Sequence, residues 1–270
     1  KDKKWTKQNF ETKISLERLM KVFDSTYLIM NNCYFKTSDG QVVGPVTLGT
    51  GSGILLKGGY FLTAHHVTDS ELGEIPPHPL YGPVEYSHSE FFLTDEKDIE
   101  EAPEPKFKLE KIVTGTEELD YTLLKLEKSD KIPFYDQGLN MPNKVDLGMQ
   151  SVVIGFPVGT GKNLRLGNVS QLKSDAGEDY YTFKNSLIPG DSGGPIFVVE
   201  NGELKLVALT RSIWIFNLGD QTMPIPQIAN INHGLKIKSI VKDVESKLKS
   251  GSLDEKTAKE VKNFLKLNKK

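Results

Sequence analysis

A serine enclosed by glycines makes the strongest case for chemistry in this chain. Residues 190–195 read Gly-Asp-Ser-Gly-Gly-Pro and stand directly before an apolar, strand-like run. Glycines beside Ser192 let the backbone turn tightly, expose the hydroxyl and direct successive N–H groups into one small concavity. Such a concavity can stabilise an oxyanion. Because a serine hydroxyl is a weak nucleophile at its ordinary pKa, nucleophilic catalysis also requires a nearby base and an acid that orients the base.

Candidates for the base and the acid lie upstream of the serine. The pair His65 and His66 follows the run Phe-Leu-Thr-Ala at 61–64, where a strand gives way to a short helical turn. A lone acid, Asp120, precedes the apolar strand pattern of residues 121–126. An acid in that position can be buried and held as the partner of an imidazole. The chain therefore offers a base, an orienting acid and a nucleophile, in that order.

The three segments resemble the Thr-Ala-x-His, Asp-x-x-Leu-Leu and Gly-Asp-Ser-Gly-Gly-Pro motifs of the trypsin-like, or chymotrypsin-fold, serine proteases. Residues 49–55, Gly-Thr-Gly-Ser-Gly-Ile-Leu, resemble the glycine-rich strand that precedes the histidine, particularly in the bacterial HtrA-type branch. The resemblance covers residues 49–231 and neither terminal helical region. It implies an all-β fold of two packed antiparallel six-stranded β-barrels, with the active site in the cleft between them.

The resemblance also implies roles for single residues. Ser192 is expected to be the nucleophile of a serine endopeptidase that works through an acyl-enzyme, with His66 as general base and Asp120 as the residue that orients it. Matching the motif puts His66 at its fourth position and leaves His65 in the variable slot. The N–H groups of Gly190 and Ser192 are expected to form the oxyanion hole.

Four further residues are expected to face the substrate. Ser186, six residues before the serine, takes the position that forms the base of the primary specificity pocket in this family, and Leu187 follows it. Thr210 and Arg211 belong to the expected wall strand. The neutral floor does not favour Lys or Arg, so a small to medium apolar substrate side chain is expected. The alternative is an acidic side chain, which the Arg211 guanidinium would favour if it reached the pocket.

The sequence leaves open how the carboxylate of Asp191 is held. No segment like Ile-Val-Gly-Gly occurs near the N-terminus to pair with Asp191 after cleavage, so zymogen activation of the digestive type is not expected. Asp191 would instead bond local backbone or a side chain, and the terminal helices or a ligand could control the order of the loop. Two rivals to a competent protease therefore stay open. One is a protease fold that is inactive until a partner orders the oxyanion loop, and the other is a binding scaffold.

Strand patterns supply the elements that must position these residues. Short strand candidates follow one another closely between residues 151 and 210, and this regular spacing favours an all-β barrel. Residues 5–23 and those after Leu235 have helical period, and Ser252 with Glu255 predicts a capping box at the start of the last helix. The expected division is an N-terminal helical extension (1–25), a first barrel (26–135), a second barrel (136–235) and C-terminal helices (236–270).

Composition bounds the class of protein and its partners. Of the 270 residues, 37% are hydrophobic and 26% charged, which is ordinary for a soluble globular protein, and no apolar run approaches the roughly 20 residues of a membrane span. The net charge of −2 argues against nucleic acid as a partner. A protein or peptide substrate is expected, and the terminal helices are the expected place for a regulatory partner. The expected chemistry uses no metal or organic cofactor, and His78, His88 and His233 lack metal-ligand spacing.

The single cysteine and the first residue bear on the compartment. Cys33 cannot form an intrachain disulfide, and its strand-like setting predicts a small core residue. The chain begins at Lys1 rather than Met, which fits either a trimmed chain or a mature one whose signal peptide has been removed. A secreted or periplasmic location is expected ahead of a cytoplasmic one.

Overall fold

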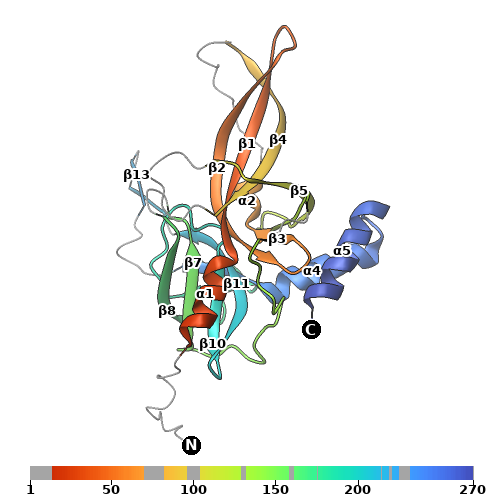
Figure 1. Cartoon of the computed structure of the whole chain (residues 1–270). Helices are drawn as coiled ribbons and strands as arrows, with labels where there is room; N and C mark the ends of the chain where they lie inside the picture. The colour runs from red at the N-terminus through yellow and green to blue at the C-terminus, as the bar shows by residue number, and fades with distance from the viewer. Residues whose placement is uncertain are drawn as a thin grey trace, which may run out of the picture.

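A computed structural model describes residues 14–69, 82–95, 104–128, 132–157, 161–174, 176–213, 215–218, 221–224 and 232–269. In these segments the chain forms two closed six-stranded antiparallel barrels with helices at both ends (Figure 1). The predicted fold class is therefore confirmed. The division at residues 25, 135 and 235 stays a prediction.

The strands of the first barrel send alternate side chains to opposite faces, into the barrel and away from it. In β2, Leu55 points into this barrel, whereas Ile54 and Leu56 point away from it toward the second barrel. The strand order is β1-β2-β3-β6-β5-β4. The bounds are β1 (Thr26–Thr37), β2 (Val42–Leu56), β3 (Tyr60–Thr63), β4 (Val84–Thr94), β5 (Phe107–Thr114) and β6 (Thr122–Leu126).

The second barrel repeats the same alternation. Val153 of β7 packs inside it, while Val152 and Ile154 face the first barrel. The strand order is β10-β11-β14-β9-β8-β7. The bounds are β7 (Gln150–Gly155), β8 (Asn163–Gln171), β9 (Tyr180–Phe183), β10 (Pro195–Glu200), β11 (Glu203–Ile213) and β14 (Asn232–Lys236), with a separate hairpin of β12 (Ile215–Leu218) and β13 (Gln221–Pro224).

Three strands of the first barrel continue beyond it as a long arm (Figure 1). β1 runs through the middle of this arm, paired with β2 on one side and β4 on the other. Cys33 lies on β1 with none of its surface exposed, so it is a buried free cysteine, as predicted. Residues 70–81 and 96–103, on either side of β4 in the sequence, lie outside the described residues.

The terminal helices dock on the barrels. α1 (Leu16–Asp24) packs Val22 into the shared core, the apolar cluster to which both barrels contribute. Its Arg18 pairs with Glu203 of the second barrel at 2.5 Å. The part of this helix predicted before residue 14 lies outside the described residues. α4 (Ile237–Ser250) and α5 (Glu255–Asn268) lie at the right of the molecule in Figure 1. No helix in the described segments is long and apolar enough to cross a membrane.

The predicted capping box at the start of α5 is wrong. The N-cap is Asp254, whose carboxylate accepts hydrogen bonds from the backbone N–H and hydroxyl of Thr257 at 3.0 and 2.6 Å. Ser252 instead donates its hydroxyl to the Lys247 carbonyl near the end of α4, at 3.3 Å. Because the preceding helix uses the serine, the next suitable acceptor along the chain caps α5.

Phe264 anchors α5 to the first barrel. It has no exposed surface and meets Tyr60 edge-on, with the ring centroids 5.3 Å apart. We expect Phe264→Ala to lower the free energy of unfolding by about 3–5 kcal/mol, because it leaves a cavity in the shared core. Phe134→Ala, at a position 45% exposed, is the control and should cost less than about 1 kcal/mol. Urea unfolding of both variants tests this, and equal losses would mean that α5 does not share the core.

Candidate active site

Strand register brings the predicted histidine and aspartate together. β3 and β6 run antiparallel with Thr63 opposite Thr122, so the turn after β3 meets the residues just before β6. His66 lies in α2 (His65–Thr68), and its Nδ1 is 2.7 Å from Asp120 Oδ2. The backbone N–H of His66 donates to Asp120 Oδ1 at 2.9 Å. The aspartate therefore holds both the imidazole and the backbone beneath it.

The neighbouring histidine has different partners. His65 Nδ1 lies 3.5 Å from Thr122 Oγ1, and its Nε2 lies 4.0 Å from Asp69 Oδ2. Only 6% of the Asp120 side chain is exposed, whereas 48% of the His66 side chain is. The geometry thus pairs His66 with a buried acid and leaves that imidazole open to a substrate.

The charge state of Asp120 fixes the tautomer of His66. Burial acts to raise the pKa of Asp120, but the hydrogen bonds and charge of His66, together with Arg211, bring that pKa below its ordinary value. An ionised carboxylate can only accept hydrogen bonds, so His66 Nδ1 carries the proton. Nε2 is then the nitrogen that can act as a base.

The serine loop, residues 188–194, begins with a tight turn. Asp191 N–H donates to the Ile188 carbonyl at 3.1 Å, and Gly190 between them has φ +100°. Pro189 followed by a glycine with positive φ is the pattern of a type II turn. A side chain at Gly193, where φ is +80°, would run into the end of β3, so this loop packs directly on the strand that leads to His66.

Hydrogen bonds within the loop leave two N–H groups open. Asp191, Gly193 and Gly194 donate their N–H groups to the carbonyls of Ile188, Thr210 and Asp191. The N–H groups of Gly190 and Ser192 donate to no acceptor in the described part of the chain. These are the two groups that the sequence assigned to the oxyanion hole.

Ser52 of β2 ties the loop to the first barrel. Its N–H donates to the Ser192 carbonyl at 2.7 Å, and its hydroxyl donates to the Gly190 carbonyl at 2.8 Å. The same hydroxyl accepts from the Phe156 N–H at 2.8 Å. Ser192 itself is half-buried, and its hydroxyl has no hydrogen-bond partner among the described residues. The hydroxyl is therefore not committed to another acceptor.

The carboxylate of Asp191 points inward. It is fully buried, accepts from the Ile188 N–H at 2.8 Å and pairs with the guanidinium of Arg165 on β8. Burial raises the pKa of Asp191 above its ordinary value, against the opposing charge and hydrogen bond of Arg165. The question that the sequence left open thus has a structural answer, since Asp191 bonds both local backbone and a side chain.

The four predicted substrate-facing residues have different surroundings. Ser186 is exposed, whereas Leu187 is 1% exposed and packs in the interior of the second barrel. Thr210 is 2% exposed. Arg211 stacks on the ring of Tyr180, donates to a backbone carbonyl at residue 117 and lies 3.6 Å from Asp120. The burial of Leu187 argues against direct contact with substrate.

The described residues contain no group of three His, Cys, Asp or Glu side chains that could hold a metal ion. His88 stacks on Tyr34 in the arm, and His233 meets the Ser174 hydroxyl at its Nδ1. His78 lies outside the described residues.

A family model described as a trypsin-like peptidase domain matches residues 51–209. The chain belongs to this family. The match covers more than half of the chain and includes the histidine, aspartate and serine segments. The predicted recognition is therefore confirmed, and so, at the level of the family, is the prediction of a serine endopeptidase.

Two further comparisons are consistent with this membership. The chain is 30% identical over 167 residues to a "Probable periplasmic serine protease do/HhoA-like" of Haemophilus influenzae. That match covers 58% of this chain and 29% of the relative, so this peptidase spans less than a third of the relative's length. Among solved structures it resembles a serine endoprotease from Yersinia pestis, with a TM-score of 0.56, 14% identity and coverage of 88% of this chain and 67% of the other. At that identity the likeness concerns the fold.

Sequence reasoning missed two residues of the site. Ser52 lies within the glycine-rich segment 49–55, where only the backbone pattern was used. Arg165 lies 26 residues before Asp191 on another strand, and nothing in its sequence neighbourhood marks it. The one available signal was Asp191 itself, an acid beside the serine that required a partner the sequence did not identify.

The lowered pKa of Asp120 predicts how stability depends on pH. Its stabilising contribution is complete above the unfolded-state pKa of about 4 and is lost as pH falls through the lower folded-state value. We expect wild type to be more stable than Asp120→Asn at pH 7, and the difference to shrink as pH drops from 5 toward 2. Urea unfolding of both proteins across that range measures it. A stability difference between wild type and Asp120→Asn that did not change with pH would contradict the assignment. Asp146→Asn, which removes an exposed ion pair with Lys144, is the control.

Proposed function

We propose that this peptidase hydrolyses peptide bonds through a triad of Ser192, His66 and Asp120 and an acyl-enzyme intermediate. The observation that carries the proposal is the pairing of His66 Nδ1 with buried Asp120 at 2.7 Å, next to a serine loop whose two flanking N–H groups are open. The surroundings of Gly51 support the proximity of the histidine segment and the serine loop. A side chain at Gly51 would collide with both Val67, which follows His66, and the Ser192 carbonyl.

In the first half of the reaction, the Ser192 hydroxyl attacks the carbonyl carbon of the scissile bond and gives its proton to His66 Nε2. Asp120 stabilises the imidazolium that forms. The carbonyl oxygen becomes an oxyanion, which the N–H groups of Gly190 and Ser192 stabilise. Collapse breaks the C–N bond, and the amine leaves with the proton from His66.

Water completes the second half. His66 Nε2 takes a proton from the water as it attacks the ester carbonyl, and the same oxyanion hole stabilises the second tetrahedral intermediate. The Ser192–acyl bond then breaks, and the proton returns to the serine hydroxyl. Each oxyanion donor contributes about 10²- to 10³-fold to kcat.

The surroundings of Arg211 favour an apolar rather than an acidic substrate side chain. Its guanidinium lies 4.8 Å above the Tyr180 ring and 3.6 Å from the Asp120 carboxylate. It also donates to a backbone carbonyl at 2.7 Å. These contacts direct the charge toward the triad aspartate, while Ser186 is an exposed, neutral residue.

We further propose protein or peptide substrates and a periplasmic or secreted location. The support is membership of the trypsin-like peptidase family and similarity to a relative described as periplasmic. A switched enzyme has less support, because the loop already forms its turn and bonds to Ser52 within this chain. A binding scaffold has less support, because His66 is paired with buried Asp120.

Labelling with a fluorophosphonate probe tests the nucleophile. Wild type should react, and mass spectrometry should place the adduct on Ser192, because only an activated serine attacks this phosphorus centre. Ser192→Ala should lose the label while keeping its fold by circular dichroism. No label on folded wild type would reject the proposal of a competent enzyme, and a label that appears only with an added partner would favour the switch.

The two adjacent histidines provide a matched pair for the base. His66→Ala should lower kcat by about a million-fold, because the triad acts as a unit. His65→Ala should stay within several-fold of wild type, because its contacts are to Thr122 and Asp69. Hydrolysis of a chromogenic peptide with an apolar residue before the scissile bond measures both. Equal losses, or a larger loss at His65, would refute the assignment of the base.

A further inference from the structure

We infer that Arg165 is the positioning residue of the oxyanion loop, and that its ion pair with Asp191 keeps the N–H groups of Gly190 and Ser192 directed toward the substrate. Arg165 would act through Asp191 without touching the substrate. This inference rests on the proposed function, because it concerns the loop that would stabilise the oxyanion.

Asp191 is the residue between the two oxyanion donors. Its N–H closes the turn to Ile188 at 3.1 Å, and its carboxylate returns to the Ile188 N–H at 2.8 Å. These two bonds hold the turn that contains the Gly190 N–H. The Ser192 N–H belongs to the peptide group that follows Asp191, so its direction depends on the Asp191 backbone. A fixed Asp191 side chain therefore fixes both donors.

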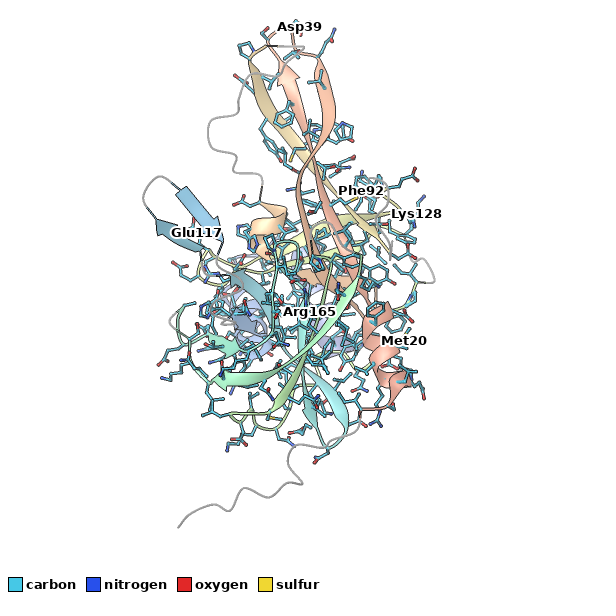
Figure 2. All side chains as sticks on the ribbon, turned by 90° about the vertical axis from the view of Figure 1, so that its left-hand side faces the viewer. Met20, Asp39, Phe92, Glu117, Lys128 and Arg165 are labelled. Carbon is cyan, nitrogen blue, oxygen red and sulfur yellow. The ribbon has the colours of Figure 1, made fainter. Side chains whose placement is uncertain are left out.

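Arg165 supplies the charge that keeps this side chain inside. It lies on β8 (Figure 2), opposite Val153 of β7. Its side chain is 14% exposed. Its Nε and Nη1 are buried and have no partner among the described residues, so Asp191 is the acceptor that the structure gives this guanidinium. A buried carboxylate is costly unless it is paired and hydrogen-bonded, so each member of the pair requires the other.

The second barrel has space for this carboxylate. Gly155 on β7 faces Asp191, and a side chain there would collide with Asp191 Oδ1. The Asn185 amide donates to the Arg165 carbonyl at 3.3 Å, which ties β8 to the segment that leads into the serine loop. Arg165 therefore projects from a rigid ladder rather than from a loop.

An internal cation has a functional consequence. If residue 165 carried no charge, the buried Asp191 carboxylate would keep only its hydrogen bond from the Ile188 N–H. One hydrogen bond would not offset the cost of burying the charge, so rotation of Asp191 toward solvent would be favoured. That rotation would turn the peptide groups on both sides of Asp191 away from the substrate. The loop of this chain would thus be ordered by its own strand β8, without a ligand or a newly cleaved terminus.

Arg165→Met tests the inference, because it keeps the length of the side chain and removes the charge. We expect kcat and the fluorophosphonate labelling rate to fall about 100-fold or more, with KM changed by less than about threefold, because the loss falls on the transition state. Arg165→Lys should recover at least a tenth of the wild-type rate. Arg18→Met, which removes an exposed pair far from the loop, is the control and should stay within about twofold.

A neutral double variant covers the case in which Arg165→Met does not fold. Arg165→Met with Asp191→Asn leaves no unpaired buried charge, so it should fold while lacking the ion pair. We expect it to label as slowly as the single variant. A peptide boronate, whose tetrahedral adduct with serine occupies the oxyanion hole, should lose affinity about 100-fold in this variant. A peptide product should bind within about threefold of wild type.

The outcomes separate the inference from the proposed function. Folded Arg165→Met or the folded double variant labelling at the wild-type rate would overturn the role of Arg165 and leave the triad standing. Equal losses of boronate and product affinity would also overturn it, since they would indicate general damage to the site. Failure of wild type to label would reject the proposed function, and the inference with it.

Discussion

An apolar layer shared by the two barrels is the constraint on which the candidate active site depends. Each barrel has its own interior, but Ile54 and Leu56 from one and Val152 and Ile154 from the other pack into a common cluster. Because successive side chains of a strand point to opposite faces, β2 and β7, which carry consecutive apolar residues, contribute both to a barrel interior and to the shared cluster. The layer packs the first barrel, which carries His66 and Asp120, against the second barrel, which carries Ser192.

Polar bridges between the two barrels orient individual residues beside this layer. Ser52 reaches from β2 to the carbonyls of Gly190 and Ser192, while Arg211 reaches from β11 toward Asp120. Each bridge is anchored in one barrel and orients a residue of the other. In our view the Arg165–Asp191 pair complements them from within the second barrel, so that the serine loop is restrained from both sides.

The C-terminal helices support the loop that carries Asp120. Tyr121 directly follows Asp120, and its hydroxyl donates to Asp243 of α4 at 2.6 Å. Lys247 of the same helix donates to a backbone carbonyl at the end of β5 at 2.6 Å. Burial, with the bond to Asp243, raises the pKa of Tyr121, so it remains a neutral donor. These helices lie beyond residues 51–209, the part that matches the family model, yet they pack directly behind the aspartate of the site.

The sequence by itself determined the features that depend on local sterics and periodicity. Glycines around Ser192 were enough to predict a tight serine loop, and the regular spacing of short strands favoured an all-β barrel. The resemblance to trypsin-like serine proteases implied two six-stranded barrels and put His66, rather than His65, at the position of the histidine that pairs with Asp120. Only the tertiary structure decided the partners of buried polar groups, such as Arg165 with Asp191, and the placement of Leu187 in a barrel interior. The cap of α5 moved to Asp254 for a similar reason, since a neighbouring helix used Ser252. A strand pattern gives the face of each residue, whereas the partner of a side chain depends on register and packing between segments far apart in the chain.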